Sequence, residues 1–287
     1  MFYLFFVSLL WAFSFGLIKG NLTGLDSNFV SFVRLFLSMI VFLPLVKFKK
    51  VNRKISWRLI ITGMVQYGLM YITYIYSFQY LQAFEVALFT IFTPIYVTII
   101  NSILKKKVNV VFFLTALMAI IGTGIVKYQD LSQSNILIGF LIVQISNVSF
   151  AFGQVYYKIT MKDIPDVKDQ EVFGILYIGG VMITALVSGL FTDFTSISIT
   201  TNQWVTLIYL GIVASGFAFF LWNLGARKVN IGALAIFNNL KVPLAVAVSL
   251  LVFGESANVP NLLLGGIIVV LSLVINEYYV RQHKLLA

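Results

Sequence analysis

The sequence predicts an all-α, multi-pass membrane protein with ten transmembrane helices, arranged as two inverted five-helix repeats with both chain ends in the cytoplasm. Composition is the first observation behind this prediction, because 60% of the 287 residues are hydrophobic and only 10% are charged. The second is a series of ten apolar runs, and the third is the placement of the basic residues between them. Soluble domains do not have this composition.

Each apolar run is long enough to cross a bilayer, because about 20 helical residues span roughly 30 Å of hydrocarbon. Helices are predicted rather than strands, since strand edges cannot stay open in lipid and barrel strands have only about ten residues. The runs cover residues 2–19, 28–47, 57–80, 84–104, 110–127, 135–158, 171–191, 203–225, 232–253 and 260–280. We expect the two repeats at residues 1–127 and 135–280.

The distribution of Lys and Arg predicts the orientation. Sixteen of the 20 lie in the even-numbered connections or in the C-terminal tail, and only Lys19 and Lys127 lie on the other side. Positive residues concentrate in cytoplasmic loops, so both termini are expected there. The net charge of +10 then reflects topology and attraction to anionic lipid. We expect a protein of the cytoplasmic (inner) membrane, with the lipid bilayer but no nucleic acid as a partner.

Residues that carry most catalytic and metal chemistry are scarce. The chain has no cysteine, and its single histidine, His283, lies in the basic C-terminal tail, whereas a metal site needs several such ligands. None of the ten acidic residues falls near the middle of an apolar run, so no catalytic cluster is expected there. We predict neither an enzyme nor a cofactor. A channel stays open as an alternative, although nothing resembles a charged ring or a carbonyl filter.

An internal repeat is visible in the sequence. Residues 63–89 resemble residues 211–237 at a constant offset of 148, and one residue of slip then pairs Pro94 with Pro243. Five helices per half is an odd number, so the halves must cross the membrane in opposite directions. Inverted repeats are typical of secondary transporters, whose solute binds near mid-membrane where helices are interrupted at matching positions. We therefore expect hinges at Pro94 and Pro243.

Two cations lie inside apolar runs. Lys241 lies ten residues into the ninth run, where a charge costs roughly 3 kcal/mol or more unless it faces protein or water. We predict that it binds an anionic solute; the alternatives are a lysine bonded to carbonyls freed by Pro243 and one that reaches the surface. Arg34 lies about 9 Å inside the second helix. Two roles stay open for this arginine. Its guanidinium could hold a carboxylate bidentately, or its side chain could reach the membrane interface.

Further polar and aromatic residues complete the predicted solute site. Those of the third and sixth runs recur at helical spacing, so they face protein or water rather than lipid. Of two neighbouring asparagines, the first shares the face of Lys241, and the second is expected to make an interhelical hydrogen bond. Helix packing or core filling is the alternative for the whole set. Its members are Asn238, Asn239, Gln144, Asn147, Gln154, Gln66, Tyr71, Tyr74, Trp11 and Trp222.

Several motifs resemble the EamA-like branch of the drug/metabolite transporter superfamily. They include the stretch from Leu10 to Ser14, the Phe92-Thr93-Pro94 turn and Gly122-Thr123-Gly124. Within that branch, LLWAFSF from Leu9 and IFNNLKVP from Ile236 are similar to the YigM-type biotin transporters. That group has Met-His-Val-Pro after the paired asparagines, where this chain has Leu-Lys-Val-Pro.

The resemblance implies a function. It implies a secondary-active transporter, which we expect to be a monomer, that imports biotin or a similar small carboxylate by alternating access. Because an anion entering a negative interior is opposed by about 2.3 kcal/mol per 100 mV, a proton or other cation should accompany it. We expect Lys241 to take up such a proton together with the carboxylate. The alternative is an EamA-type exporter of amino acids or related small metabolites.

Overall fold

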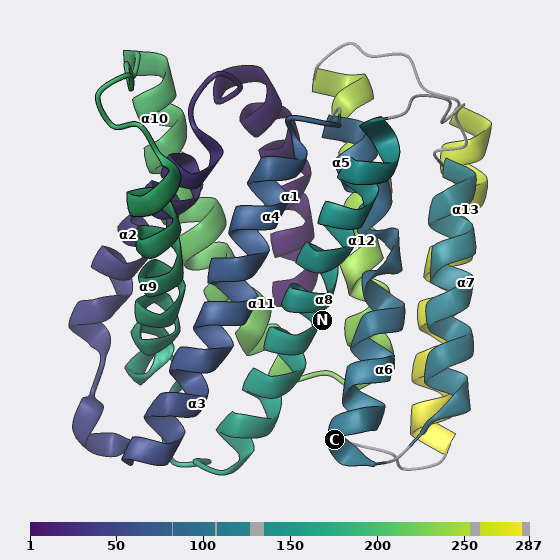
Figure 1. Ribbon diagram of the computed structural model, residues 1–287. Coiled ribbons are helices and arrows are strands. Elements are labelled where there is room, and N and C mark those ends of the chain that lie inside the picture. Colours follow the sequence, from purple (N-terminus) through teal and green to yellow (C-terminus); the bar gives the residue numbers. More distant parts are fainter. Residues whose placement is uncertain (82, 107, 127–134, 253–258, 283–287) are drawn as a thin grey trace.

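A computed structural model of the chain describes residues 1–81, 83–106, 108–126, 135–252 and 259–282. Side chains at a few helical positions, 241–243 among them, lie outside the described part. The structure is a bundle of helices that stand side by side (Figure 1). The described residues contain no strand, and only an isolated bridge joins Thr23 and Leu25.

The first half of the chain forms five helical stretches, two of which change their helix type on the way. In the third stretch a π-helical segment, η3, joins two α-helices, and in the fourth a 3₁₀ turn, η4, does so. The elements are α1 (Phe2–Asn21), α2 (Ser27–Phe42), η1 (Leu43–Leu45), η2 (Phe48–Lys50), α3 (Arg53–Gly63), η3 (Met64–Leu69), α4 (Met70–Ser77), α5 (Ala83–Phe89), η4 (Thr90–Phe92), α6 (Thr93–Lys105) and α7 (Val110–Val126).

In the second half, a second π-helical segment, η6, joins α10 and α11, and α12 is a continuous α-helix. The elements are α8 (Asn135–Lys162), η5 (Asp169–Glu171), α9 (Phe173–Phe191), α10 (Thr201–Tyr209), η6 (Leu210–Phe217), α11 (Ala218–Arg227), α12 (Ile231–Val252) and α13 (Val259–Gln282).

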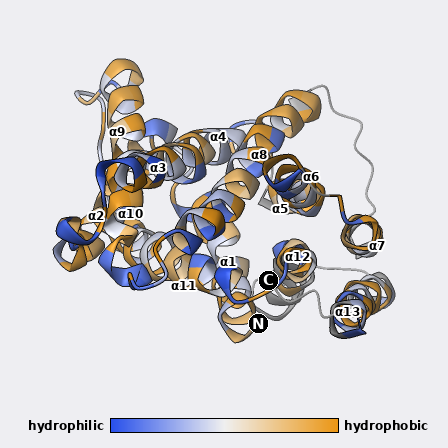
Figure 2. Cartoon of the chain, turned by 90° about the horizontal axis from the view of Figure 1, so that it is seen from below, coloured by the Kyte–Doolittle hydropathy of each residue, from blue (hydrophilic) through white to orange (hydrophobic). Residues whose placement is uncertain are grey.

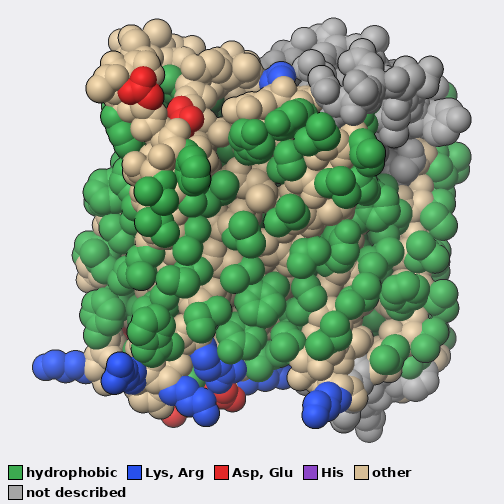
Figure 3. Space-filling model, viewed as in Figure 1, with side chains coloured by type: hydrophobic (Ala, Val, Ile, Leu, Met, Phe, Trp, Pro, Cys, Tyr) green, Lys and Arg blue, Asp and Glu red, His purple; other side chains and the backbone are tan. Residues whose placement is uncertain are grey.

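Among the described residues, seven helices are long and apolar enough to cross a membrane. Three shorter apolar helices, at 110–122, 231–240 and 263–279, fall within the fifth, ninth and tenth predicted runs. Hydrophobic side chains cover the sides of the molecule, and most Lys and Arg side chains visible in Figure 3 gather at its lower end. The prediction of an all-helical, multi-pass membrane protein is therefore confirmed.

Polar residues at the helix starts explain several of the boundaries. The carboxylate of Asp26 accepts hydrogen bonds from the main-chain N–H groups of Asn28 and Phe29 at the start of α2. Asn52 caps α3 in the same way, and α10 begins with a capping box of Thr200 and Gln203. Such caps satisfy donors that the first helical turn leaves unpaired.

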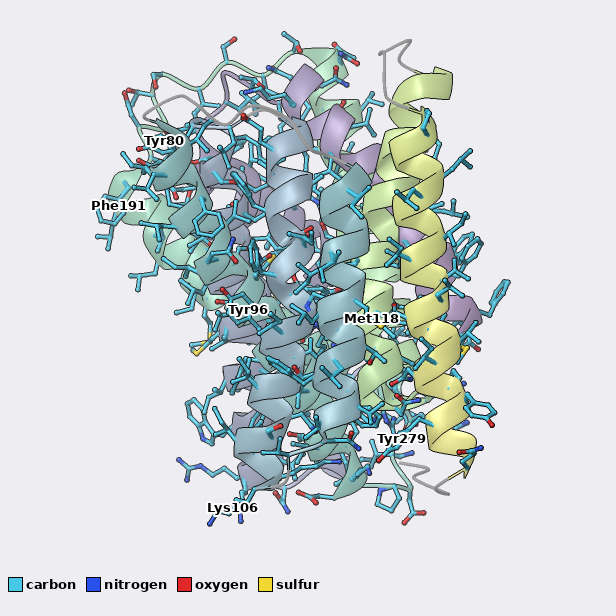
Figure 4. The ribbon with its side chains drawn as sticks, turned by 90° about the vertical axis from the view of Figure 1, so that its right-hand side faces the viewer. Tyr80, Tyr96, Lys106, Met118, Phe191 and Tyr279 are labelled. Atoms are coloured by element: carbon cyan, nitrogen blue, oxygen red, sulfur yellow. The ribbon has the colours of Figure 1, made fainter. Side chains whose placement is uncertain are left out.

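The helices of one half pack against those of the other in matching pairs. α2 lies against α9, α6 against α12, and α7 against α13, while α1 and α8 lie between the two sides of the bundle. Figure 2 shows the α7–α13 pair at one edge and α2 and α9 at the other. Figure 4 shows Lys106 at one end of the bundle and Tyr80 near the other, and we call these the basic end and the opposite end.

Glycines allow the closest of these contacts. A Cβ atom on Gly63 would lie 1.8 Å from the carbonyl oxygen of Leu176, and one on Gly179 would lie 2.1 Å from that of Ile60. The backbones of α3 and α9 can touch only because neither position carries a side chain. Gly211, the second residue of η6, lies against the Leu37 side chain of α2.

We therefore expect Gly179→Ala to lower the thermal unfolding temperature of the detergent-solubilised protein, because the clashing atom is backbone and the helices must separate at a cost of about 1–3 kcal/mol. Gly189→Ala, on the same helix with open space around the new Cβ, is the matched control and should leave the temperature unchanged or slightly raised. Equal effects of the two substitutions would contradict the close-contact explanation.

Ion pairs close the basic end of the bundle around the segment from Asp163 to Glu171, which we call the acidic segment. Glu171 is buried and contacts Lys47 at 2.9 Å and Lys50 at 2.8 Å. Asp169 pairs with Arg227 of α11 at 2.5 Å, and Asp163 pairs with Arg58 of α3. The acidic segment thus connects the α8–α9 junction to elements of both halves of the chain.

The two lysines make stability depend on pH. Hydrogen bonds from Lys50 and then Lys47 lower the pKa of the Glu171 carboxyl from 4.5 to about 2. Because the folded-state pKa is depressed, the stabilisation is fully present above pH 4.5 and is lost as the pH falls toward 2. Glu171→Gln should therefore be less stable than wild type at pH 7, and the two melting temperatures should converge on acidification. Asp166→Asn, an exposed carboxyl on the acidic segment, is the control; a constant gap for Glu171→Gln across pH would contradict the assignment.

Candidate functional site

A partly open cavity of about 70 Å³ lies inside the bundle, and a single buried cation, Arg34, lines it. Its walls come from α1, α2, α4, η4, α8 and α11, so both halves of the chain contribute. The lining residues are Trp11, Ser14, Phe15, Ile18, Arg34, Met70, Tyr71, Tyr74, Thr90, Ser146, Asn147, Phe150 and Phe219.

Arg34 is held by hydroxyl groups rather than by an acid. Its side chain is 2% exposed, so the interfacial alternative is wrong for this residue. Nε donates to Ser215 Oγ at 3.2 Å and Nη2 donates to the Tyr71 hydroxyl at 3.1 Å. Nη1 is buried without a hydrogen-bond partner among the described residues, and no ion pair of Arg34 occurs there either. An unsatisfied charged donor is costly, so this atom has hydrogen-bonding capacity that the described residues do not use.

The π-helical turn of η6 places Ser215 beside this guanidinium. The Ser215 hydroxyl donates to the carbonyl of Leu210, five residues back, at 2.7 Å. The wider turn also frees main-chain carbonyls, which side chains of other helices bind: Tyr177 OH donates to Ser215 O at 2.5 Å, and Trp11 Nε1 donates to Ala214 O at 3.0 Å. Such π-helical turns are frequent at functional sites.

Aromatic rings form most of the cavity wall. Trp11 lies 4.8 Å from Phe219 and 5.8 Å from Phe150 between ring centroids, and Phe15 meets Tyr74 at 6.0 Å. The Arg34 guanidinium also lies 4.7 Å from the centroid of the Tyr71 ring. This combination of apolar rings with one cation favours an anionic solute that has a hydrophobic body.

A second polar group lies where α8 meets η4. Asn147 donates both amide hydrogens, to Phe89 O at 2.8 Å and to Gln144 Oε1 at 3.1 Å. The Gln144 oxygen also accepts from Tyr96 of α6, a residue labelled in Figure 4. Of the predicted residues, Asn147 therefore reaches the cavity, whereas Gln144 supports it from behind.

Other predicted residues form a separate buried network. Trp222 donates from Nε1 to Gln154 Oε1 at 2.9 Å, and Asn238 donates to the same oxygen at 3.2 Å. Gln66 exchanges two hydrogen bonds with Asn223 of α11, at 2.9 and 3.2 Å. These residues do not line the cavity, although Trp222 contacts Trp11 at 4.9 Å between ring centroids.

The ninth run is only partly described. Asn239 donates to the carbonyl of Ile91 at 3.0 Å, an interhelical hydrogen bond, and its Oδ1 has no partner among the described residues. α12 is helical from Ile231 to Val252, but the side chains of Lys241 and Pro243 lie outside the described part, so their roles stay predictions. Pro94 lies at the start of α6, directly after the 3₁₀ turn η4.

Sequence reasoning missed several residues that line the cavity and one, Ser215, that binds Arg34 beside it. Ser215 is positioned by the π-helical turn, and no sequence pattern predicts that turn. Single serines, threonines and phenylalanines are too common inside apolar runs to be identified as site residues. The offset of 148 did place Gly211 and Gly216 at a special position, five residues apart within η6. The missed residues are Ser215, Ser14, Thr90, Ser146, Phe15, Phe150 and Phe219.

A second, wider hollow lies toward the opposite end. It holds about 630 Å³ and shares Ile18 with the cavity. Its other walls include residues 22–27 and 196–198, which lie in the connections at that end. The basic end, by contrast, is held together by the acidic segment and its ion pairs.

The helices define a multi-pass membrane protein whose cavity is lined by residues from both halves of the chain. Residues 1–128 and 137–277 each match the EamA-like transporter family. The chain belongs to that family, and it is a transporter rather than an enzyme.

Named relatives cover almost the whole chain. It is 36% identical to a "Probable biotin transporter" of Pseudomonas aeruginosa over 98% of this chain and 99% of that protein. It is 35% identical to the "Biotin transporter" of Salmonella typhimurium and 34% identical to that of Escherichia coli strain K12, in both cases over 96% of this chain and 93% of the relative. A solved structure described as "Crystal structure of protein" has a TM-score of 0.75 at 16% identity, with 97% of both chains covered, and has the same fold.

Proposed function

We propose that this protein is a secondary-active transporter that imports biotin across the cytoplasmic membrane by alternating access. The observation that carries the proposal is Arg34, a buried cation with an unpartnered Nη1 in an aromatic cavity. Biotin carries a carboxylate on a flexible chain and a compact bicyclic body, which match these two features. The names of relatives at 34–36% identity support the same substrate.

The proposed architecture is ten transmembrane helices in two inverted repeats, with the basic end in the cytoplasm. Support comes from the two family matches, at residues 1–128 and 137–277. It also comes from the two π-helical segments, because Gly63 before η3 lies against α9 and Gly211 in η6 lies against α2. A pseudo-twofold axis in the membrane plane would produce such a reciprocal pair.

Alternating access fits the unequal ends of the bundle. The hollow beside Ile18 would admit the solute from outside, and the ion pairs of the acidic segment would keep the cytoplasmic end closed until the solute is bound. Opening that end would break contacts between the acidic segment and Arg58, Lys47, Lys50 and Arg227. Because the membrane potential opposes anion entry, we propose that a proton or another cation accompanies biotin, with Lys241 as the proton acceptor. We propose a monomer as the working unit.

Uptake of labelled biotin into proteoliposomes containing the purified protein tests the substrate. Unlabelled biotin and dethiobiotin should compete for uptake, whereas amino acids in large excess should not. Liposomes without protein are the control, and expression should also rescue the growth of a biotin auxotroph at limiting biotin. Competition by amino acids, with no saturable biotin uptake, would instead support the EamA-type exporter.

Substitutions of the two intramembrane cations distinguish the binding of biotin from the coupling of its uptake to a proton. Arg34→Gln should weaken biotin binding by roughly 10- to 100-fold, because hydrogen bonds to a charged group contribute about 1.5–3 kcal/mol. Arg34→Lys should recover only part of this, since lysine lacks the planar fork. Lys241→Ala should instead reduce the response of uptake to an imposed pH gradient. Unchanged biotin affinity in a well-folded Arg34→Gln protein would remove the arginine from the site.

A further inference from the structure

The polar atoms that line the cavity are divided between a donor end and an acceptor end. At Arg34 the available atom is an N–H donor. The serine and threonine hydroxyls of the wall already use their hydrogens: Thr90 donates to Ala87 O at 2.7 Å, Ser146 donates to Met70 O at 3.3 Å, and Ser14 donates to Leu10 O at 3.2 Å. A serine or threonine hydroxyl has one hydrogen, so these groups can now only accept.

Asn147 has the same limitation. Both hydrogens of its amide are engaged, with Phe89 O and Gln144 Oε1. What remains for the cavity is the carbonyl oxygen Oδ1. Asn147 is hydrogen-bonded to Phe89, which directly precedes Thr90 in the chain. The acceptor oxygens of Asn147 and Thr90 therefore belong to the same part of the cavity wall. We call Thr90, Ser146 and Asn147 the acceptor cluster.

Within the acceptor cluster, Thr90 and Asn147 lie away from Arg34. Ser146 is instead bonded to Met70 of α4, the helix that also contacts Arg34 through Tyr71. Arg34 belongs to α2, which packs against α4, α9 and η6, whereas Thr90 and Asn147 belong to η4 and α8, which pack against each other. Aromatic side chains of α1 and α11 fill the wall between these groups. The ligand that best fits the cavity therefore carries an anionic or acceptor group at one end and an N–H donor at the other.

We propose that the acceptor cluster binds the N–H groups of the ureido ring while Arg34 binds the carboxylate. The proposal rests on biotin as the solute and adds which residues select it. A ureido ring presents two N–H donors side by side, which need acceptors that do not compete as donors. Solutes with a carboxylate but no such N–H groups would leave the acceptor cluster unpaired, and this loss is the physical basis of discrimination.

Equilibrium binding to the purified protein tests the assignment with three ligands. Biotin and dethiobiotin both keep the ureido N–H groups, whereas lipoate has a carboxylate and a sulfur ring without them. In the Thr90→Val/Ser146→Ala double variant, biotin and dethiobiotin should each bind about tenfold more weakly. The affinity for lipoate, measured by competition against labelled biotin, should stay at its wild-type value, so selectivity should fall.

A matched control is available on the same helix. Ser149 of α8 is also buried, its hydroxyl also donates to a helix carbonyl, Ile145 O at 2.8 Å, and it does not line the cavity. Ser149→Ala should leave all three affinities unchanged. Equal losses for biotin and lipoate in the double variant, or no loss for either, would overturn the assignment while biotin transport stands. If wild-type protein binds no biotin, the proposed function fails, and this assignment fails with it.

Discussion

The buried guanidinium of Arg34 is the constraint on which the rest of the site depends. A positive group inside an apolar bundle must be surrounded by polar partners, and here these are hydroxyls, Ser215 at 3.2 Å and Tyr71 at 3.1 Å. Hydroxyls satisfy two N–H groups without cancelling the charge, as a carboxylate would. The cation therefore keeps its attraction for an anion, and Nη1 has no hydrogen-bond partner among the described residues.

The second half of the chain supplies part of the polar surroundings that the Arg34 guanidinium needs. The π-helical turn η6 brings Ser215 to the guanidinium, and the carbonyls that the turn frees are bound by Tyr177 and Trp11. Ser38 of α2 binds a further one, Gly211 O, at 2.7 Å. One local change of helix type thus couples α1, α2, α9 and η6 around the cation, and any rearrangement of the bundle would alter the environment of Arg34.

Sequence reasoning reached the class of fold and some of the residues that line the cavity. Composition and run length were sufficient for an all-helical membrane protein, because lipid leaves few other solutions. Arg34, Trp11, Tyr71, Tyr74 and Asn147 were also identified, since polar and aromatic groups stand out in apolar runs. Gln154, Asn238 and Gln66 were chosen by the same reasoning, but they lie in a network behind the wall, because an isolated sequence cannot tell which polar residues pair with each other. Neither the burial of Arg34 nor the π-helical turn could be predicted, since both depend on how α2 packs against η6.

A crystal structure of the protein with biotin bound would test the central claim most directly, through the position of the ligand carboxylate. The account predicts that a carboxylate oxygen lies within hydrogen-bond distance of Arg34 Nη1, with Ser215 and Tyr71 still bound to the guanidinium. A carboxylate bound at Lys241 or elsewhere, with Arg34 Nη1 hydrogen-bonded to the protein instead, would contradict it.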